Sequence, residues 1–485
     1  MTAITRRPSG KSVITWWCCV SLSALIFRMA ILPFASRYGY QYDHDGFVRW
    51  GIQATDVGLL TLYDRPPPRW DMQVMKEGQR RITQQKEEHL CNYPPLAIYL
   101  LYCSGVVFKA VGSDRLINTC TSRAVFESWS ILADVVLALG CAAIVARLKP
   151  GGAARWTYLL VLAAPPFWLD SVIWGQMDSV ALAPAMWMLW AVIAGRWWLA
   201  GLFFGLMAGF KTQALLLVPL WIWILLVCRP WWKPVLSLGM AMAVLQAVAL
   251  PFTLHSGWAW WRSAYLENLT VACPQTTLMA FNLWYVNLLS TDCGDVMVRW
   301  WGLTKDTWGR VFLAIGLAGG YVWLLRRWRR DHRGLVLFAA LSLLFLVMLP
   351  TRVHERYLIL MLPFLALATA IWPRFWPGLG LLLLVATAQM TWPMWLSAVP
   401  SQWPMIERQI TQSFERRIPP AERSKHLPWL TADLASAKRH YQSRRSRTVG
   451  LEWTLTGYAL AGALWTAAVA AAVKPREARE EPSTE

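Results

Sequence analysis

The sequence predicts an all-α polytopic membrane protein with about 11–13 transmembrane helices and a long first extracytoplasmic loop. Of its 485 residues, 56% are hydrophobic and only 15% are charged, whereas a soluble domain carries about 25% charged residues. Apolar runs recur from residue 14 to residue 473, and many approach the roughly 20 residues that a helix needs to cross a bilayer. Composition and run length therefore indicate the same fold class.

The apolar segments follow one another along the chain, separated by polar connections. They are expected at residues 14–34, 95–112, 124–146, 156–172, 177–195, 197–210, 212–228, 233–254, 307–325, 334–350, 356–372, 375–397 and 450–473. The basic residues Arg6, Arg7 and Lys11 precede the first segment. Since Lys and Arg collect in cytoplasmic loops, we expect the N-terminus in the cytoplasm and the stretch after the first helix outside.

The segment 95–112 decides the topology of the rest. If it crosses the membrane, the basic connections 147–155 and 326–333 fall outside. If it is re-entrant or interfacial, both connections fall in the cytoplasm, the side that Lys and Arg favour. Pro94 and Pro95 at its start also argue against a regular helix interior there. The second layout is therefore preferred.

This layout gathers the unusual polar clusters of the chain on one face of the membrane. Asp43, Lys211 and the segments 174–179, 255–270 and 351–356 all fall outside. Polar groups at membrane depth are costly and usually mark function, so their convergence predicts a site. The basic loop 398–449 falls outside as well, so either it is a large external domain or one helix after residue 371 is miscounted.

The net charge of +19 has an ordinary explanation in a membrane protein. Cytoplasmic loops rich in Lys and Arg meet anionic lipid, whereas nucleic-acid binding would need a basic, aromatic stretch in a soluble domain. The nine Cys show no CxxC or Cys/His ligand spacing, so no metal site is indicated by them. The sequence also has no nucleotide cradle, so the membrane itself would have to present an activated donor.

The segment YQYDHDGFVRWG, residues 40–51, sets two acids just after the first apolar run. Asp43 and Asp45 stand two places apart beside Tyr40 and Trp50. A carboxylate outside the membrane can take a proton from a hydroxyl group, and aromatic rings suit the faces of sugars. The alternative is an ordinary solvated acidic loop.

The segment TRVHERYL sets ionisable residues at the mouth of a later helix. His354 and Arg356 suit a phosphate group, Arg through its paired donors, and Glu355 lies between them. The alternatives are an interfacial anchor belt or an internal Glu–Arg pair.

Three further polar clusters have both a functional and a structural interpretation. Lys211 in GFKTQAL either serves the site or snorkels from a helix end. Gln176 and Asp178 in WGQMDS lie in a tight outer turn, where they serve the site or cap the following helix. Glu267 lies in a polar outer stretch that lines an acceptor groove or merely connects two helices.

Seven short motifs occur in one order within residues 15–372: DHDGFVRW, NYPPLAIY, ILADVV, WGQMDS, FKTQAL, AFNLW and VHERYL. Together they resemble membrane glycosyltransferases of the GT-C type. The chain is most similar to the dolichyl-phosphate-glucose-dependent glucosyltransferases of the endoplasmic reticulum and to bacterial relatives of the second GPI mannosyltransferase. The resemblance implies an inverting transfer of a hexose, mannose or glucose, from a polyprenyl or dolichyl phosphate donor. The acceptor would be a glycan or glycolipid on the extracytoplasmic face.

The same resemblance implies roles for individual residues. The acid seven places before the Trp of the first outer loop is the catalytic base in this family, which implies Asp43, with Asp45 as its candidate partner. The donor phosphate would be bound by His354, Arg356 and Lys211, with Arg356 standing where the glucosyltransferases carry Lys. Residues implied to line the substrate are Trp50, Asn92, Tyr93, Gln176, Asp178, Glu267 and Glu355. The resemblance also implies a site that works with no cofactor and no tightly bound metal. The motifs end by residue 372, which leaves the acceptor undefined.

The predicted organisation follows from these assignments. It comprises a cytoplasmic N-terminus over 1–13, a GT-C-like catalytic module over 14–372 with the outer loop 35–123 and its re-entrant or interfacial helices, a variable C-terminal transmembrane part over 373–473 with the basic loop 398–449, and a polar tail over 474–485. We expect a bacterial cytoplasmic membrane with a periplasmic site, or the endoplasmic reticulum with a lumenal site. The main alternative function is a transporter or flippase for a lipid-linked sugar, whose polar groups should lie near helix midpoints.

Overall fold

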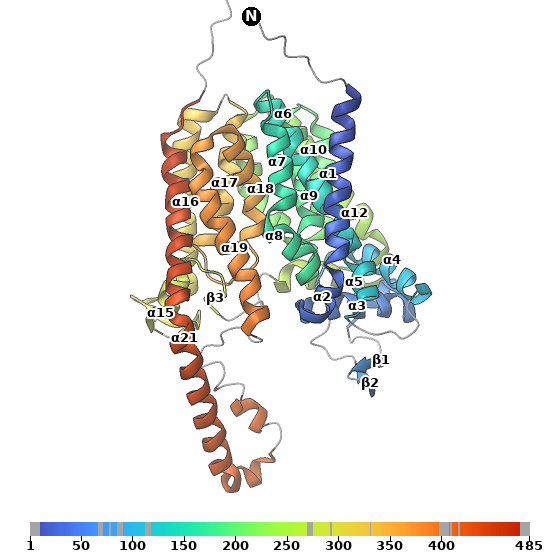
Figure 1. Ribbon diagram of the computed structural model, residues 1–485, viewed down its shortest axis with the longest axis vertical. Helices are drawn as coiled ribbons and strands as arrows, with labels where there is room; N and C mark the ends of the chain where they lie inside the picture. Colours follow the sequence, from blue (N-terminus) through green and yellow to red (C-terminus); the bar gives the residue numbers. More distant parts are fainter. Residues whose placement is uncertain are drawn as a thin grey trace, which may run out of the picture.

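The structure is a computed structural model that describes residues 10–475 except 66–70, 77–78, 85–90, 112–117, 269–274, 292, 330, 397–406, 408–409 and 416–417. It is an almost wholly helical bundle, as predicted (Figure 1). Helix α1 (Gly10–Ala30) begins at one end, here called the basic end, and runs to the other, here called the site end. The chain then forms a set of short elements at the site end: α2 (Leu32–Tyr38), α3 (Gln41–Asp56), the 3₁₀ turn η1 (Leu59–Tyr63), the hairpin strands β1 (Asp71–Lys76) and β2 (Gln79–Gln84), α4 (Pro95–Val111) and α5 (Cys120–Phe126).

The remaining elements build the bundle in two stretches. The first contains α6 (Ser128–Leu148), α7 (Ala153–Ala163), α8 (Pro165–Trp168), the π-helical η3 (Leu169–Trp174), α9 (Asp178–Ile193), α10 (Trp197–Phe210), η4 (Thr212–Leu217), α11 (Val218–Val227) and α12 (Trp232–Ser256). Between the stretches lie α13 (Ala259–Trp261), the π-helical η5 (Arg262–Glu267), β3 (Thr277–Leu278), α15 (Leu283–Thr291), β4 (Arg299–Trp300) and β5 (Leu303–Thr304). The second contains α16 (Lys305–Trp328), α17 (Arg333–Met348), β6 (Val353–His354), α18 (Leu358–Ile371), η6 (Pro373–Phe375), α19 (Trp376–Leu396), η7 (Pro420–Glu422) and α21 (Arg423–Ala472).

Six helices of the described part are long and apolar enough to cross a membrane, and a seventh span is obtained if α7 is joined to Pro165–Trp174 across a 45° bend. Six shorter apolar helices of 10–17 residues accompany them. The expected number of 11–13 is therefore reached only if most of these shorter helices cross as well. The all-α polytopic class is confirmed.

Helices α17 and α18 lie inside the bundle. Their sequences, RGLVLFAALSLLFLVM and LILMLPFLALATAI, are apolar around the whole circumference, and nearly all of their residues are buried. A helix that is hydrophobic on every side can either face lipid or be enclosed by other helices, and the burial of these two shows that they are enclosed. This position fixes the short segment between them, which carries His354, Glu355 and Arg356.

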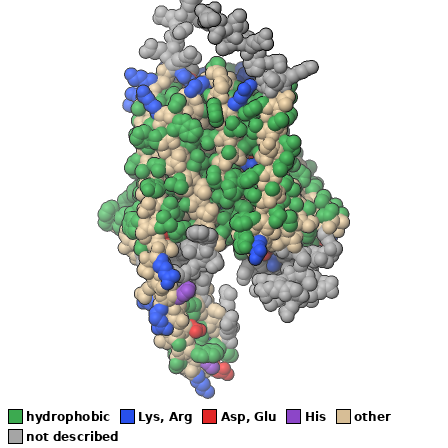
Figure 2. All heavy atoms as spheres, in the orientation of Figure 1, with side chains coloured by type: hydrophobic (Ala, Val, Ile, Leu, Met, Phe, Trp, Pro, Cys, Tyr) green, Lys and Arg blue, Asp and Glu red, His purple; other side chains and the backbone are tan. Residues whose placement is uncertain are grey.

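Helix α4 packs on α3 at the site end, where it lies beside the bundle (Figure 1). The two backbones approach closely at Gly51 and Gly105, since a Cβ added at Gly105 would lie only 2.2 Å from the Gly51 carbonyl oxygen. The two glycines are therefore required by the crossing itself. The connections 147–155 and 326–333 lie at the opposite, basic end, where Lys and Arg side chains gather (Figure 2).

The C-terminal part differs from the sequence prediction. The segment 398–449 was expected as a basic loop, but from Arg423 it is helical and continues without a break into the last apolar segment. The result is α21, a single helix of 50 residues whose first half extends past the bundle at the site end (Figure 1). The sequence favours this because residues 429–472 contain no proline.

Candidate active site

Asp43 lies in the first turn of α3, half-buried at the site end. The chain is extended at Tyr40 and becomes helical at Gln41, so the carboxylate stands next to the free N–H groups of the helix start. That position favours a negative charge. Helix α3 buries Val48 and Ile52 on its other face, which leaves the Asp43 side chain 18% exposed and turned toward Arg356. It is not a solvated loop residue.

Arg356 brings three carboxylates together. Its Nη1 atom lies 3.4 Å from Oδ2 of Asp43 and 3.3 Å from Oε1 of Glu355, and its Nε atom lies 3.7 Å from Oδ2 of Asp178. These acids come from three distant parts of the chain, α3, α9 and the segment before α18. A planar guanidinium with several fixed donors can serve all three at once. The Glu–Arg pair considered from the sequence is present, but it is one contact of a larger cluster.

Lys211 lies deeper in the same cluster. Its Nζ atom donates to Oδ1 of Asp178 at 2.5 Å and to Oε1 of Gln176 at 3.3 Å, and the side chain is only 3% exposed. The Tyr93 hydroxyl donates to the same Gln176 oxygen at 2.9 Å. A snorkelling lysine would reach water, so this interpretation of Lys211 is wrong. Asp178 does not cap α9 either, because the N-cap residue is Met177 and no side chain caps it.

His354 lies at the outer edge of the cluster, with a side chain that is 27% exposed. Its backbone is fixed by the parallel pairing of β6 with β3, which sets His354 opposite Leu278. Burial of the ring, followed by the nearby charges of Arg356 and Lys211, lowers the pKa of His354 well below its usual value. The imidazole is therefore neutral at pH 7, and it would meet an anion by donating an N–H rather than as a cation.

Glu355 is buried under the cluster, and burial raises its pKa to about 7 despite the opposing effect of Arg356. The nearby Asp43 carboxylate adds to the increase. The charge of the cluster therefore changes with pH in the neutral range, because Glu355 gains or loses its proton there.

Aromatic rings enclose the two cations. The Arg356 guanidinium lies 5.8 Å from the Trp174 ring centre, and Lys211 Nζ lies 5.7 Å from that of Tyr93. Trp174 is stacked on Tyr40 at 4.1 Å, and Tyr93 contacts the Trp50 ring at 5.7 Å. Such rings attract cations and also offer flat surfaces to a sugar.

Three of the predicted residues lie outside this cluster. Asp45 interacts electrostatically with Arg123, on another side of α3 from the Asp43–Arg356 contact. Asn92 donates to Asn268 at 3.3 Å. Glu267 binds Arg65, with Oε1 accepting at 2.8 Å. These three residues therefore make their contacts around the cluster. The other predicted residues contact the cluster directly or through Tyr93.

One family model matches the chain, that of glycosyltransferase family 87, over residues 92–350. The chain belongs to glycosyltransferase family 87. It is therefore a membrane glycosyltransferase, an enzyme of class EC 2.4, and a transporter function is not favoured. None of the curated proteins matches the chain.

The family 87 match covers only part of the cluster. It includes Tyr93, Gln176, Asp178 and Lys211, but it begins after Asp43 and ends four residues before His354. The cluster is completed by α3, which precedes the matched region, and by the segment that follows it. The contacts of Arg356 therefore join the matched part of this family 87 chain to both of its flanks.

A buried arginine that the sequence did not single out holds the walls of the candidate site together. Arg123 of α5 is fully buried, and it donates to the carbonyl of Tyr40 at 3.1 Å and to those of Val172 and Ile173 at 3.1 and 3.2 Å. Its Nη1 atom also donates to Glu127 at 2.7 Å. Tyr40 begins the helix of Asp43, and Ile173 precedes Gln176 by three residues. Arg123 therefore ties the segment of the candidate base to the segment of Gln176 and Asp178.

A second buried network supports the same candidate site from below. Asp134 of α6 accepts from Arg28 at 2.7 Å, from Ser171 at 2.7 Å and from Ser179 at 2.5 Å. Asp134 is the acid of the ILADVV motif, and an acid within an apolar segment was the signal that could have marked it. Asp170, also fully buried, lies near Asp178 and adds a further acid to this layer.

Proposed function

We propose that this glycosyltransferase moves a hexose, mannose or glucose, from a polyprenyl or dolichyl phosphate to a hydroxyl group of a glycan or glycolipid. The observation that carries the proposal is the contact between Asp43 and Arg356 within a cluster that also holds Lys211. It joins a carboxylate able to take a proton with cations able to bind a phosphate. The likeness of the seven motifs to GT-C enzymes supports the finer assignment.

The proposed reaction is a single displacement at the anomeric carbon. Asp43 takes the proton of the acceptor hydroxyl as its oxygen bonds to that carbon, and the bond from the carbon to the phosphate oxygen breaks. The electron pair leaves with the carrier phosphate, and the anomeric configuration is inverted. Because a phosphate leaves readily, no second carboxylic acid has to protonate it, unlike in a glycosidase.

The cations act on the leaving group. Arg356 already lies between Asp43, Glu355 and Asp178, so a phosphate would enter by sharing its donors. Lys211 adds charge from below and neutral His354 adds an N–H from the outer edge. Donors fixed before the reaction stabilise the charge that develops on the phosphate.

Neither a nucleotide nor a tightly held metal has a part in this proposal. The carrier lipid would reach the site from the membrane beside the bundle, and nucleic acid is not a partner. Chelation by EDTA is therefore expected to leave the transfer rate unchanged. A rate that falls on chelation and returns with Mg²⁺ or Mn²⁺ would assign part of the phosphate binding to a metal instead.

The proposed location of the reaction is the extracytoplasmic face. Its support is the gathering of Lys and Arg on the bundle itself at its opposite end (Figure 2), since such residues favour the cytoplasmic side. The basic first half of α21, which extends past the site end, is the exception to this pattern. We propose a bacterial cytoplasmic membrane with a periplasmic site, with the endoplasmic reticulum lumen as the alternative.

The test is sugar transfer in proteoliposomes by the wild type, Asp43→Asn and Asp56→Asn. Asp56 is the matched control, because it ends the same helix, is 19% exposed against 18% for Asp43, and is paired with Lys109. Donors are polyprenyl-phosphate mannose, polyprenyl-phosphate glucose and the nucleotide sugars, with a crude lipid extract as acceptor. Transfer from a lipid donor that Asp43→Asn abolishes and Asp56→Asn retains is expected. Equal transfer by Asp43→Asn and the wild type would refute the assignment of Asp43 as the base. Transfer from nucleotide sugars alone would refute the lipid phosphate as the donor.

A further inference from the structure

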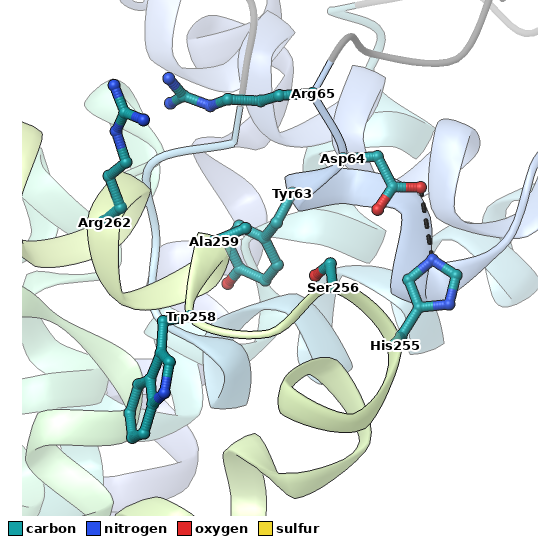
Figure 3. Close-up of a pocket in the computed structure, with 8 residues that line it drawn as sticks. All are labelled: Tyr63, Asp64, Arg65, His255, Ser256, Trp258, Ala259 and Arg262. Atoms are coloured by element: carbon teal, nitrogen blue, oxygen red, sulfur yellow. Dashed lines mark hydrogen bonds and ion pairs between the residues drawn. The ribbon is translucent and has the colours of Figure 1, made fainter.

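A cavity of about 800 Å³ opens at the site end, beside the cluster and separate from it. Its lining, drawn in Figure 3, consists of Tyr63, Asp64, Arg65, His255, Ser256, Trp258, Ala259 and Arg262. These residues come from the segment that follows α3, from the last turn of the apolar helix α12 and from the segment after it. The cavity therefore lies where a candidate membrane span ends, at the level expected for the polar surface of a bilayer.

The charged groups of the cavity wall are balanced once Glu267, which lies beside the wall, is included. Arg65 donates to Glu267 through both terminal nitrogens, and Arg262 donates to the same carboxylate through Nε at 3.1 Å. Across the cavity, Asp64 faces His255 at 3.3 Å (Figure 3). Two guanidinium groups are thus matched by two carboxylates. A neutral ligand rich in hydroxyl groups suits such a surface better than an anion does, because each hydroxyl can both donate and accept.

Two lining side chains are exposed enough to meet a ligand. Arg262 is 64% exposed, and its Nε is the atom that binds Glu267, so its terminal nitrogens face outward. Trp258 is 59% exposed at the turn after Gly257. Indole rings bind the C–H faces of sugars, and guanidinium groups bind their hydroxyls. Because Trp258 lies apart from Arg262 in Figure 3, the two side chains would contact different rings of one ligand.

The cavity is linked to the candidate active site through two tyrosines, Tyr63 and Tyr93. The Tyr63 hydroxyl donates to the carbonyl of Tyr93, and the Tyr93 hydroxyl donates to Gln176, which also accepts from Lys211. The side chains of Tyr63 and Tyr93 would therefore separate a ligand in the cavity from the cluster. A second link is provided by Asn92, next to Tyr93, which accepts from Asn268 at 2.7 Å beside Glu267.

We propose that this cavity is a saccharide-binding subsite that holds a sugar of the acceptor other than the one that receives the hexose. The inference rests on the proposed function and extends it, because it makes the acceptor a neutral oligosaccharide or the glycan part of a glycolipid. The volume is typical of sites that enclose a ligand of several rings. A monosaccharide acceptor would fill the reacting position alone and leave the subsite empty.

The test is direct binding to the purified full-length protein in a polyoxyethylene detergent, since alkyl glycoside detergents would themselves compete. The ligands are mannotriose, maltotriose, mannose, glucose and inorganic phosphate, and the binding of each is measured by calorimetry. The variants are Arg262→Gln and Trp258→Ala, and the matched controls are Arg299→Gln and Trp301→Ala, which change exposed residues at the same end. All four positions are at the surface, so folding is expected to be retained.

A trisaccharide is expected to bind the wild type more tightly than its monosaccharide does. Each cavity variant should weaken that binding about fivefold, the loss of roughly one neutral hydrogen bond or ring contact, and neither control should. Absence of trisaccharide binding, equal binding by the cavity variants, or displacement by phosphate would each overturn the subsite.

Failure of the subsite and failure of the proposed function are distinguishable. The binding measurement needs no donor and no turnover, and it should give the same result in Asp43→Asn. If no transfer from a lipid donor is observed but trisaccharide binding still depends on Arg262, the proposed donor is refuted and the subsite is retained.

Discussion

At the scale of single residues, Arg356 determines how the cluster is charged. It contacts Asp43, Asp178 and Glu355, and the pKa of Arg356 is raised by these acids in spite of its burial. The guanidinium therefore stays charged, and the changes that pH can bring come from its neighbours. Removing Arg356 would leave several buried acids without a partner, which is why milder changes at its neighbours are more informative.

The first prediction concerns Glu355 and pH. Glu355 is protonated below its pKa of about 7, and above it the new charge would compete with the proposed donor phosphate for Arg356. We expect kcat/KM for the donor to fall as the pH rises through about 7, and Glu355→Gln to remove this fall. The measurement is the pH profile of both proteins. The same fall in Glu355→Gln would assign it to another group.

The raised pKa of Glu355 also makes the free energy of unfolding depend on pH, and the direction of the change can be stated. The folded-state pKa of Glu355, about 7, lies above its ordinary value of 4.5, so the folded protein binds this proton more tightly. Its stabilising contribution is complete below pH 4.5 and is lost as the pH rises through about 7. Thermal unfolding of the wild type and Glu355→Gln across this range checks it.

The second prediction concerns His354. His354→Ala should raise KM for the lipid donor, with a fall in kcat/KM of about tenfold or more, because one hydrogen bond to a charged phosphate is lost. The matched control is His332→Ala, an exposed histidine in the connection between α16 and α17 at the basic end. An unchanged KM in His354→Ala would move the phosphate site away from this segment.

The sequence predicted the residues of the cluster better than their partners. Asp43, Lys211, His354 and Arg356 stand out because each is an ionisable group beside long apolar runs. Their arrangement could not be predicted, because it depends on which helices pack together. Asp45 illustrates the limit: two places from Asp43 along the chain, it lies on another side of a helix that advances about 100° per residue.

At the scale of elements, the site is assembled from segments that Arg123 holds in place. The turn at Gly175, between the segment held by Arg123 and Gln176, has a φ of +72°. A Cβ added there would lie only 2.5 Å from Oε1 of Glu127. Only glycine fits there without displacing the partner of Arg123. None of these contacts is visible in the sequence, because Arg123 looks like an ordinary basic residue in a short connection.

The third prediction tests this positioning role. Arg123→Lys keeps a cation near Glu127 but cannot reach the carbonyls of Tyr40, Val172 and Ile173 together. We expect kcat to fall at least tenfold with a small change in KM, because a displacement of about 1 Å at a reacting group costs up to roughly a hundredfold in rate. The measurement is steady-state kinetics on folded protein, with Arg310→Lys, 75% exposed, as the control.

A purely structural role for Arg123 would give a different result. Thermal unfolding would shift, while the remaining folded enzyme would turn over at the wild-type rate. An unchanged kcat in the folded fraction would therefore reject the positioning role and leave only the contribution to stability.

At the scale of the whole molecule, the fold class followed from composition, whereas the path of the chain did not. Apolar runs identify helices, yet α9, α10, α11, α17 and α18 have only 10–16 residues, and their inclusion in the bundle depends on neighbours that bury them. The helical state of 423–449 was missed because a charged stretch lacks the apolar periodicity that marks a helix.

The fourth prediction concerns orientation. In a background without native cysteines, Trp301→Cys at the site end should react with an impermeant thiol reagent from outside the cell, and Arg196→Cys, between α9 and α10, should not. Both residues are exposed, so accessibility to water is matched. The reverse pattern of labelling would place the site in the cytoplasm and require a donor supplied there.

The continuous helix α21 has a mechanical consequence. Fifty residues span about 75 Å, whereas a bilayer core is about 30 Å thick, so much of the rod stands clear of the lipid. Its apolar half packs on α19, so the half that extends past the bundle is expected to follow any tilt of the bundle as a lever would. A probe at Trp429, near the tip, would thus magnify small tilts of the bundle into displacements of several ångströms and report substrate entry from outside the membrane.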